Sequence, residues 1–128
     1  KIASREIRKS KTLLLDLEKD RPLDTKYDII CSSMCMHHVL ELDRVLLHFH
    51  TILNPSGWLC IADLSKEDGS FHGSDFKGHN GFDQNELSSK LERIGFYNIR
   101  SKTVYECEKV IGGIYKKFPI FLTTARKI

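Results

Sequence analysis

The fold is decided by Tyr27-Asp28-Ile29-Ile30-Cys31-Ser32-Ser33 and, beyond a helical segment, by Trp58-Leu59-Cys60-Ile61-Ala62-Asp63-Leu64. Both are short, continuous apolar runs, which are typical of strands covered on both faces of a parallel sheet. The segment between them carries an apolar stripe at helical spacing, formed by Leu42, Val45, Leu46, Phe49, Ile52 and Leu53. Asn54-Pro55-Ser56-Gly57 then ends the helix. Strand, helix and strand with short connections predict a βαβ unit and a parallel sheet.

Two further segments flank this unit. Lys11–Leu17 is a short apolar run that ends beside an acid, and it is predicted to be a buried strand. Residues 65–81 form a long, polar, Gly-rich segment with two histidines. Loops of this length without secondary structure of their own are usually functional or mobile.

The C-terminal part of the sequence predicts a helix and a hairpin. Asp83 is a candidate N-cap, with Glu86 three residues on, and Gly95 is placed to end that helix. Phe96–Lys109 alternates between apolar and polar residues, which indicates an edge strand. Phe118–Ala125 is apolar on both faces and is expected inside the sheet, with Pro119 at its start. A short Gly-rich link predicts that the two strands are antiparallel.

Length and composition indicate a globular domain. The chain has 128 residues, of which 41% are hydrophobic and 29% charged. No run approaches the ~18 apolar residues of a membrane span, and the N-terminus lacks the apolar core of a signal peptide. The four cysteines form no Cys-x-x-Cys pair, which predicts a reducing, cytoplasmic environment without disulfides. The chain begins without Met, inside what reads as a charged helix, so we expect a fragment.

Charge and histidine spacing bear on two other functions. Residues 1–11 carry a net charge of +4, and the other residues sum to −1 of the overall +3. No aromatic residue interleaves the basic ones, so a solvated helix face is favoured over nucleic-acid binding. None of the six histidines has the His-x-x-x-His spacing, and we expect no metal site.

Tyr27-Asp28-Ile29-Ile30, Met36-His37-His38-Val39 and Leu53-Asn54-Pro55-Ser56-Gly57 resemble, in their order and spacing, class I S-adenosylmethionine-dependent methyltransferases of the small-molecule type. Glu67–His72 and Phe118–Leu122 are similar to one branch of them. The resemblance implies an α/β, Rossmann-like, mostly parallel sheet with a C-terminal antiparallel hairpin. Residues 1–128 would be a single truncated domain with strands 3, 4, 5, 6 and 7 of that fold and helices on both faces.

One part of the family pattern is absent. The chain contains no Gly-x-Gly turn, and its first glycine is Gly57. The acid that ends the family's second strand is missing as well. We therefore expect the first two strands to lie upstream of Lys1, and the chain alone to bind cofactor weakly and to be inactive. The edge at Tyr27–Ser33 would then be exposed, which predicts either an upstream segment or self-association through this edge.

The resemblance also implies residues that bind the cofactor, S-adenosylmethionine. Asp16 would accept a hydrogen bond from the adenine amino group, with Leu17 packed beside the ring. Ser32, Ser33 and Met34 would line the methionine part. The alternatives are a strand-end acid in water for Asp16 and a simple strand-to-helix turn for the other three.

The acceptor side would use His37 and His38 as catalytic residues, one of them orienting substrate or acting as a base, because histidine titrates near neutral pH. Asp63, at the same rim, and His72 and His79, in the long loop, would contact a small-molecule methyl acceptor. Packing or capping remains the alternative for at least one of the adjacent histidines, and an uncommitted exposed position for the loop histidines.

The implied reaction is a direct displacement, in which the protein mainly aligns the acceptor with an already activated methyl group. No nucleophilic protein residue is required. The alternative function is a non-catalytic α/β interaction module that has lost the cofactor site. A Gly-rich turn in the coding sequence upstream of Lys1 would favour the enzyme.

Overall fold

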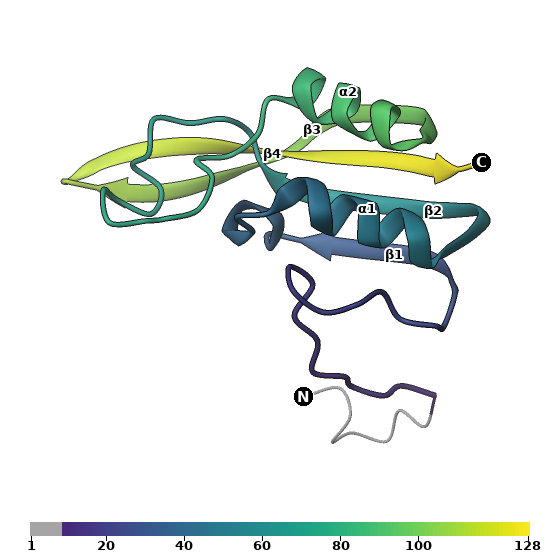
Figure 1. Ribbon diagram of the computed structural model, residues 1–128. Coiled ribbons are helices and arrows are strands. Elements are labelled where there is room, and N and C mark those ends of the chain that lie inside the picture. The colour runs from purple at the N-terminus through teal and green to yellow at the C-terminus, as the bar shows by residue number, and fades with distance from the viewer. Residues whose placement is uncertain (1–8) are drawn as a thin grey trace.

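The computed structural model describes residues 9–128, which form a four-stranded sheet and two α-helices (Figure 1). The basic opening segment lies mostly in residues 1–8, outside the described residues. The elements, in chain order, are β1 (Tyr27–Ser33), the short 3-10 helix η2 (Met36–His38), α1 (Leu42–Ile52), β2 (Leu53–Leu64), α2 (Gln84–Ile94), β3 (Phe96–Ile111) and β4 (Ile114–Lys127).

The sheet has the order β1-β2-β4-β3. β1 and β2 are parallel and are connected through α1, which confirms the βαβ unit. β4 is antiparallel to both β2 and β3, which confirms the hairpin, the edge position of β3 and the interior position of β4. The expectation of a mostly parallel sheet is wrong for residues 9–128, because only the β1–β2 pairing is parallel.

The strand predicted at Lys11–Leu17 is not formed. This segment is irregular, and Leu13 and Leu14 are 65% and 101% exposed. An apolar run becomes a buried strand only where a neighbouring strand binds its backbone groups, and no described strand lies beyond β1. The sheet therefore has four of the five predicted strands.

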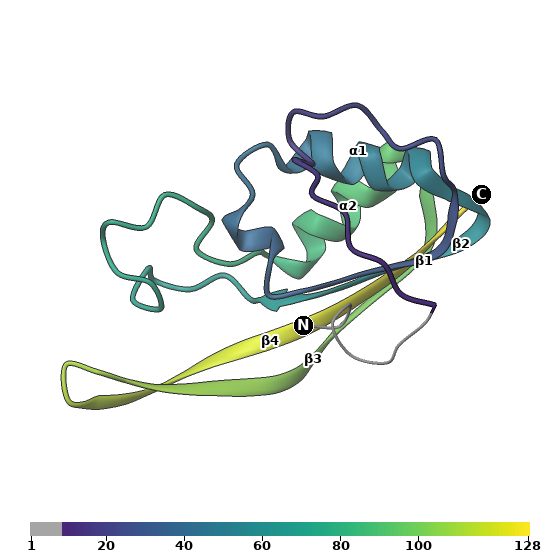
Figure 2. The same cartoon turned by 90° about the horizontal axis from the view of Figure 1, so that it is seen from below.

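Both α-helices pack on the same face of the sheet (Figure 2). The core lies between them and alternate residues of the two central strands, with Leu59 and Ile61 on β2 and Phe121 and Ala125 on β4. The other face of β2 is only half-buried. The expectation of helices on both faces is therefore wrong for the described residues. The connection between β3 and β4 contains no helix that could cover the other face, because it is a two-residue turn.

The sequence signals for the helix termini agree with the structure. The Asp83 side chain accepts a hydrogen bond from the backbone N–H of Glu86 at 3.0 Å, and Gly95 follows α2 directly. At the start of α1, the Glu18 carboxylate accepts from the backbone N–H groups of Leu40 and Glu41, both at 2.7 Å. Among the described residues, no helix combines the length and the apolar character needed to cross a membrane.

The hairpin of β3 and β4 extends beyond the end of β2 as a two-stranded arm (Figure 1). β2 pairs with β4 only as far as Leu64, opposite Ile120. Pro119 is therefore not at the start of β4 but where β4 stops being an interior strand. There its carbonyl accepts a hydrogen bond from the backbone N–H of Ser65 at 2.9 Å, one residue beyond the last β2–β4 pair, so its missing N–H falls where that ladder ends. Loop 65–81 lies along this arm (Figure 2).

Candidate functional site

The candidate site lies where the two parallel strands end. β1 stops at Ser33, η2 follows within three residues, and β2 stops at Leu64. In open α/β sheets, ligands bind outside the carboxyl ends of parallel strands. This edge brings residues from η2, from the end of β2 and from loop 65–81 together.

His37 and Asp63 form a buried pair at this edge, with exposed fractions of 1% and 0%. The Nδ1 atom of His37 lies 2.6 Å from Oδ1 of Asp63. The same carboxylate accepts hydrogen bonds from the backbone N–H groups of His37, at 3.1 Å, and Leu64, at 2.8 Å. Because a carboxylate only accepts, Nδ1 carries the proton, and a neutral His37 has its lone pair on Nε2.

His72, from the long loop, faces this lone pair. The Nε2 atoms of His37 and His72 are 2.9 Å apart. His38 completes the group, with its ring centroid 4.2 Å from that of His37 and 5.2 Å from that of His72. Phe76 stacks on His72 at 4.1 Å and fixes its ring. Partial desolvation lowers the pKa of His72, and its neighbours His37, His38 and Lys109 lower it further. Four of the predicted residues, His37, His38, Asp63 and His72, thus gather at one site.

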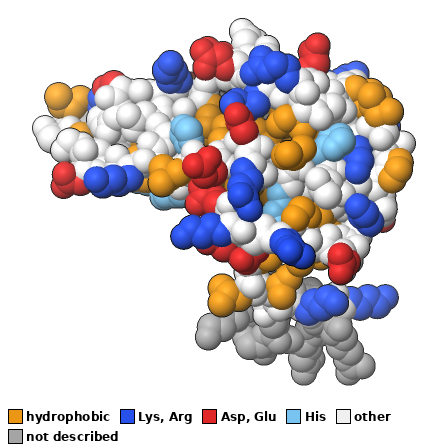
Figure 3. Space-filling view, in the orientation of Figure 1, with side chains coloured by type: hydrophobic (Ala, Val, Ile, Leu, Met, Phe, Trp, Pro, Cys, Tyr) orange, Lys and Arg blue, Asp and Glu red, His pale blue; other side chains and the backbone are white. Residues whose placement is uncertain are grey.

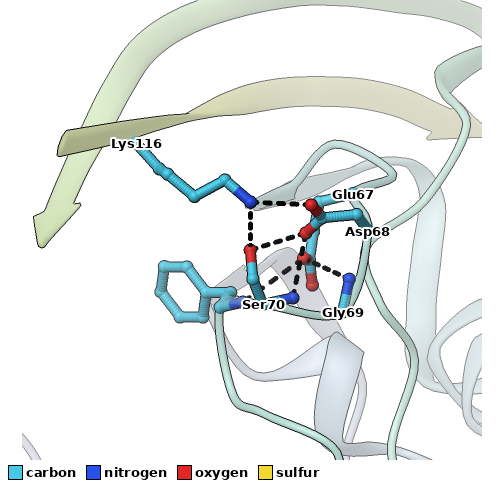
Figure 4. Close-up of polar contacts among 6 residues, drawn as sticks. Glu67, Asp68, Gly69, Ser70 and Lys116 are labelled. Carbon is cyan, nitrogen blue, oxygen red and sulfur yellow. Dashed lines mark hydrogen bonds and ion pairs between the residues drawn. The ribbon is translucent and has the colours of Figure 1, made fainter. Parts of the chain in front are cut away.

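Loop 65–81 is held to the arm by Lys116 of β4 (Figure 4). Its Nζ atom donates to Oδ2 of Asp68 at 2.7 Å and to Oγ of Ser70 at 2.9 Å. The Lys116 ammonium, followed by the hydroxyl and backbone N–H of Ser70, holds the pKa of Asp68 well below its usual range. These contacts fix the turn of the loop that precedes His72.

Glu67 and Lys109 shape the same turn. The Glu67 carboxylate accepts from the backbone N–H groups of Gly69, at 2.6 Å, and Phe71, at 3.3 Å (Figure 4). Lys109 of β3 donates to the carbonyl of Phe71 at 2.6 Å, and its ammonium lies over the Phe71 ring. No local sequence pattern indicates these supporting residues, because only the fold of the arm brings side chains so distant in the chain beside the loop.

His79 does not join the group. Its backbone N–H donates to the carbonyl of His37 at 2.7 Å, so the loop returns to η2 here. Its ring lies beside Phe82 and lines a separate cavity at the edge of α2, together with Lys66 and Lys90. The structure therefore places His79 as a backbone support of His37, with its side chain in another cavity.

The residues expected to bind cofactor are spread over two segments. Asp16 lies in an exposed turn, where its carboxylate accepts from the backbone N–H of Glu18 at 2.9 Å. Leu17 packs against the main core. Ser32 and Ser33 end β1 as predicted. Met34 has a positive φ of 56°, and its side chain packs against a smaller apolar cluster around Leu64, Phe118 and Ile120. The cofactor roles of these residues remain predictions.

The surface that carries the helices shows basic and acidic side chains interspersed, without a large area of one sign (Figure 3). A nucleic-acid interface is recognised by basic residues clustered on one face. Among the described residues, the basic side chains on this face are not gathered in that way.

Comparison with known proteins identifies the family. The methyltransferase domain family matches residues 3–101. The chain is 38% identical over 60 residues to an uncharacterized methyltransferase of Schizosaccharomyces pombe, which is 47% of this chain and 21% of that protein. It is 42% identical over 55 residues to a non-reducing polyketide synthase of Aspergillus calidoustus, 41% of this chain and 2% of the synthase.

Solved structures agree on the fold. A SAM-dependent methyltransferase of Thermotoga maritima superposes with a TM-score of 0.63 at 16% identity, over 83% of this chain and 60% of that one. The SAM-dependent methyltransferase SibL gives a TM-score of 0.69 at 11% identity, over 91% of this chain and 35% of that one. This chain thus spans less than two thirds of the length of each of these four proteins. It belongs to the methyltransferase domain family and has the fold of part of a SAM-dependent methyltransferase.

Proposed function

We propose that this chain is the acceptor-side, C-terminal part of a catalytic domain that transfers a methyl group from S-adenosylmethionine to a small molecule. The observation that carries the proposal is the buried His37–Asp63 pair at the edge where the parallel strands end, in which the Nε2 atom of His37 faces the loop residue His72 at 2.9 Å. A buried carboxylate that orients a histidine in one tautomer is a general-base arrangement.

In the proposed reaction, an oxygen or carbon atom of the acceptor attacks the methyl carbon in line with the carbon–sulfur bond. That bond breaks with its electrons going to sulfur, which leaves S-adenosylhomocysteine as product. His37 Nε2 takes the proton that the acceptor atom loses. Asp63 stabilises the imidazolium that results, and it holds the ring in the required orientation.

An acceptor with a removable proton on oxygen or carbon suits this pair, because a base contributes only where a proton must leave. The resemblance to a polyketide synthase supports this class of acceptor. So does the structural similarity to the CurJ carbon methyltransferase, with a TM-score of 0.52 at 17% identity over 79% of this chain. His38 and His72, beside the base, would contact the acceptor.

The cofactor would contact Asp16, Leu17, Ser32, Ser33 and Met34 from this chain, and a Gly-rich turn from elsewhere in the protein. Such a turn lets backbone approach the ligand closely. We expect the 128-residue chain alone to bind S-adenosylhomocysteine weakly and to be inactive. Titration calorimetry that shows micromolar affinity would contradict this expectation.

The function is tested by extending the chain at Lys1 with its upstream coding sequence and measuring transfer of radiolabelled methyl from S-adenosylmethionine to a panel of phenols and β-keto thioesters. We expect transfer that His37→Gln abolishes while cofactor binding persists. If the extended protein neither binds cofactor nor transfers methyl, the chain is the non-catalytic interaction module instead.

A further inference from the structure

His37, His38 and His72 form a cluster that can do more than supply the general base of the proposed reaction. One ligand nitrogen from each of His37, His38 and His72 lies within 4.8 Å of the others. The ligands come from η2 and from a loop position 35 residues further on, so no short sequence motif announces them. We propose that these three imidazoles bind a transition-metal ion, with Zn²⁺ as the best match.

The orientation of the His37 ring against Asp63 favours a cation between the rings. Asp63 fixes the proton on Nδ1, so Nε2 offers a lone pair toward His72. Two imidazole nitrogens 2.9 Å apart cannot both carry a proton, and they share either one proton or one cation. Neutral imidazole is the form that binds metal.

The surroundings also match those of known metal ligands. A metal-bound histidine usually donates its other ring N–H to a carboxylate, which fixes the ring and strengthens the ligand. Asp63 has this position behind His37. Phe76 stacks on the His72 ring and holds it in place, while Glu67 and Lys109 hold the loop that carries it.

The donor set selects the class of metal. Three nitrogen ligands suit Zn²⁺, Cu²⁺, Ni²⁺ or Fe²⁺, whereas Mg²⁺ and Ca²⁺ require oxygen. His37 is buried, but His38 and His72 are exposed. The site is therefore open on one side, as in zinc sites that have three protein ligands and a water molecule.

Metal binding would regulate the proposed methyl transfer, and this consequence alone rests on the proposed function. A metal bound to Nε2 of His37 occupies the lone pair that would accept the proton. Zn²⁺ is then an inhibitor that competes with the base role, and a chelator restores the activity.

The site is tested on the purified 128-residue chain without acceptor or cofactor, so the outcome is independent of the methyltransferase activity. ZnCl₂ is titrated by calorimetry, and Co²⁺ is used as a probe through its visible absorption. We expect one ion per chain. His72→Ala and His38→Ala should each weaken binding by at least about tenfold, and Asp63→Asn by roughly 10- to 100-fold, as for other outer-shell partners.

His79→Gln is the matched control, because His79 lies in the same loop with its ring in another cavity. It should bind Zn²⁺ as the unmodified chain does. Circular dichroism and thermal unfolding show whether each variant is folded. The proposal is overturned if the folded His38 and His72 variants bind Zn²⁺ as tightly as the unmodified chain, if His79→Gln loses binding equally, or if the unmodified chain binds no Zn²⁺.

Discussion

The Nδ1 atom of His37 lies 2.6 Å from Oδ1 of Asp63, and both side chains are excluded from solvent. His37 follows β1 and Asp63 lies at the end of β2, 26 positions further along the chain. The βαβ unit makes the contact, because parallel strands deliver their carboxyl ends to the same edge. Both residues were predicted for the acceptor side, but the hydrogen bond between them is visible only in the fold.

Asp63→Asn should lower kcat for methyl transfer by roughly a hundredfold to ten-thousandfold, the usual contribution of a positioned acid or base. An amide can donate, so Nδ1 of His37 no longer needs to be the protonated nitrogen. KM for S-adenosylmethionine should stay unchanged, since Asp63 acts through His37. The measurement is steady-state kinetics on the chain extended at Lys1.

Two comparisons separate this positioning role from a purely structural one. Asp63→Glu keeps the carboxylate and should recover part of the lost kcat. His37→Gln should reduce kcat as much as Asp63→Asn, and combining the two should cost little more, because the residues act as a unit. Equal loss for Glu and Asn at position 63, with lowered thermal stability in both, would point to damage of the core instead.

The second prediction concerns burial. Leu46 is fully buried, and Leu46→Ala should cost about 2–5 kcal/mol of unfolding free energy. Leu14 is fully exposed, and Leu14→Ala should stay within about 0.5 kcal/mol. Urea unfolding followed by fluorescence of Trp58 measures both. A large loss for Leu14→Ala would mean that residues 11–17 pack in solution as the strand that the sequence predicts.

Local patterns in the sequence specify most of the elements correctly. The stripe of α1, the Asp83 cap of α2 and the alternation of β3 each reflect a periodicity within one segment. The strand predicted at Lys11–Leu17 is not formed, because an apolar run shows that a segment can be buried but not that a partner strand is present. The helices share one face for a similar reason: their apolar stripes do not specify which side of the sheet they cover.

The sequence likewise predicts part of the candidate site, but not the contacts that support it. Strand ends identified His37, His38 and Asp63, and the family resemblance added His72. The contacts of Lys109 with Phe71 and of Lys116 with Asp68 join residues 38 and 48 positions apart, and nothing in the local sequence indicates them. The histidine cluster that we propose as a metal site escapes prediction for the same reason, since spacing rules detect only ligands close in the chain.

The third prediction is a pH dependence of the loop. The Lys116 ammonium and Ser70 lower the pKa of Asp68 in the folded state. The charged Asp68 side chain therefore stabilises the loop at pH values above the ordinary carboxyl pKa of about 4. That contribution disappears as the pH falls through the depressed pKa. Hydrogen exchange of residues 67–72 should therefore be faster in Asp68→Asn than in the unmodified chain at neutral pH. The difference should shrink in acid.

Lys116→Met is the matching change on the arm and should loosen the same amides, since it removes the donor to both Asp68 and Ser70. Lys117→Met is the control, because among the described residues Lys117 forms an ion pair with Glu106 alone, at 3.9 Å, and both side chains are exposed. Equal exchange in all of these proteins would show that the contacts in Figure 4 do not hold the loop.

The last prediction compares two glycines of loop 65–81. Gly81 and Gly73 have similar positive φ values, 80° and 90°. A Cβ at Gly81 would overlap the carbonyl oxygen of Ser65, whereas a Cβ at Gly73 meets nothing within 4 Å. Both alanine variants bear the same strain of a left-handed backbone. Gly81→Ala must in addition push Ser65 away from the bridge that Ser65 forms with Phe82, where the loop leaves and rejoins the sheet. Gly81→Ala should therefore lower the thermal midpoint clearly more than Gly73→Ala, and equal midpoints would contradict the close approach of Ser65 and Phe82.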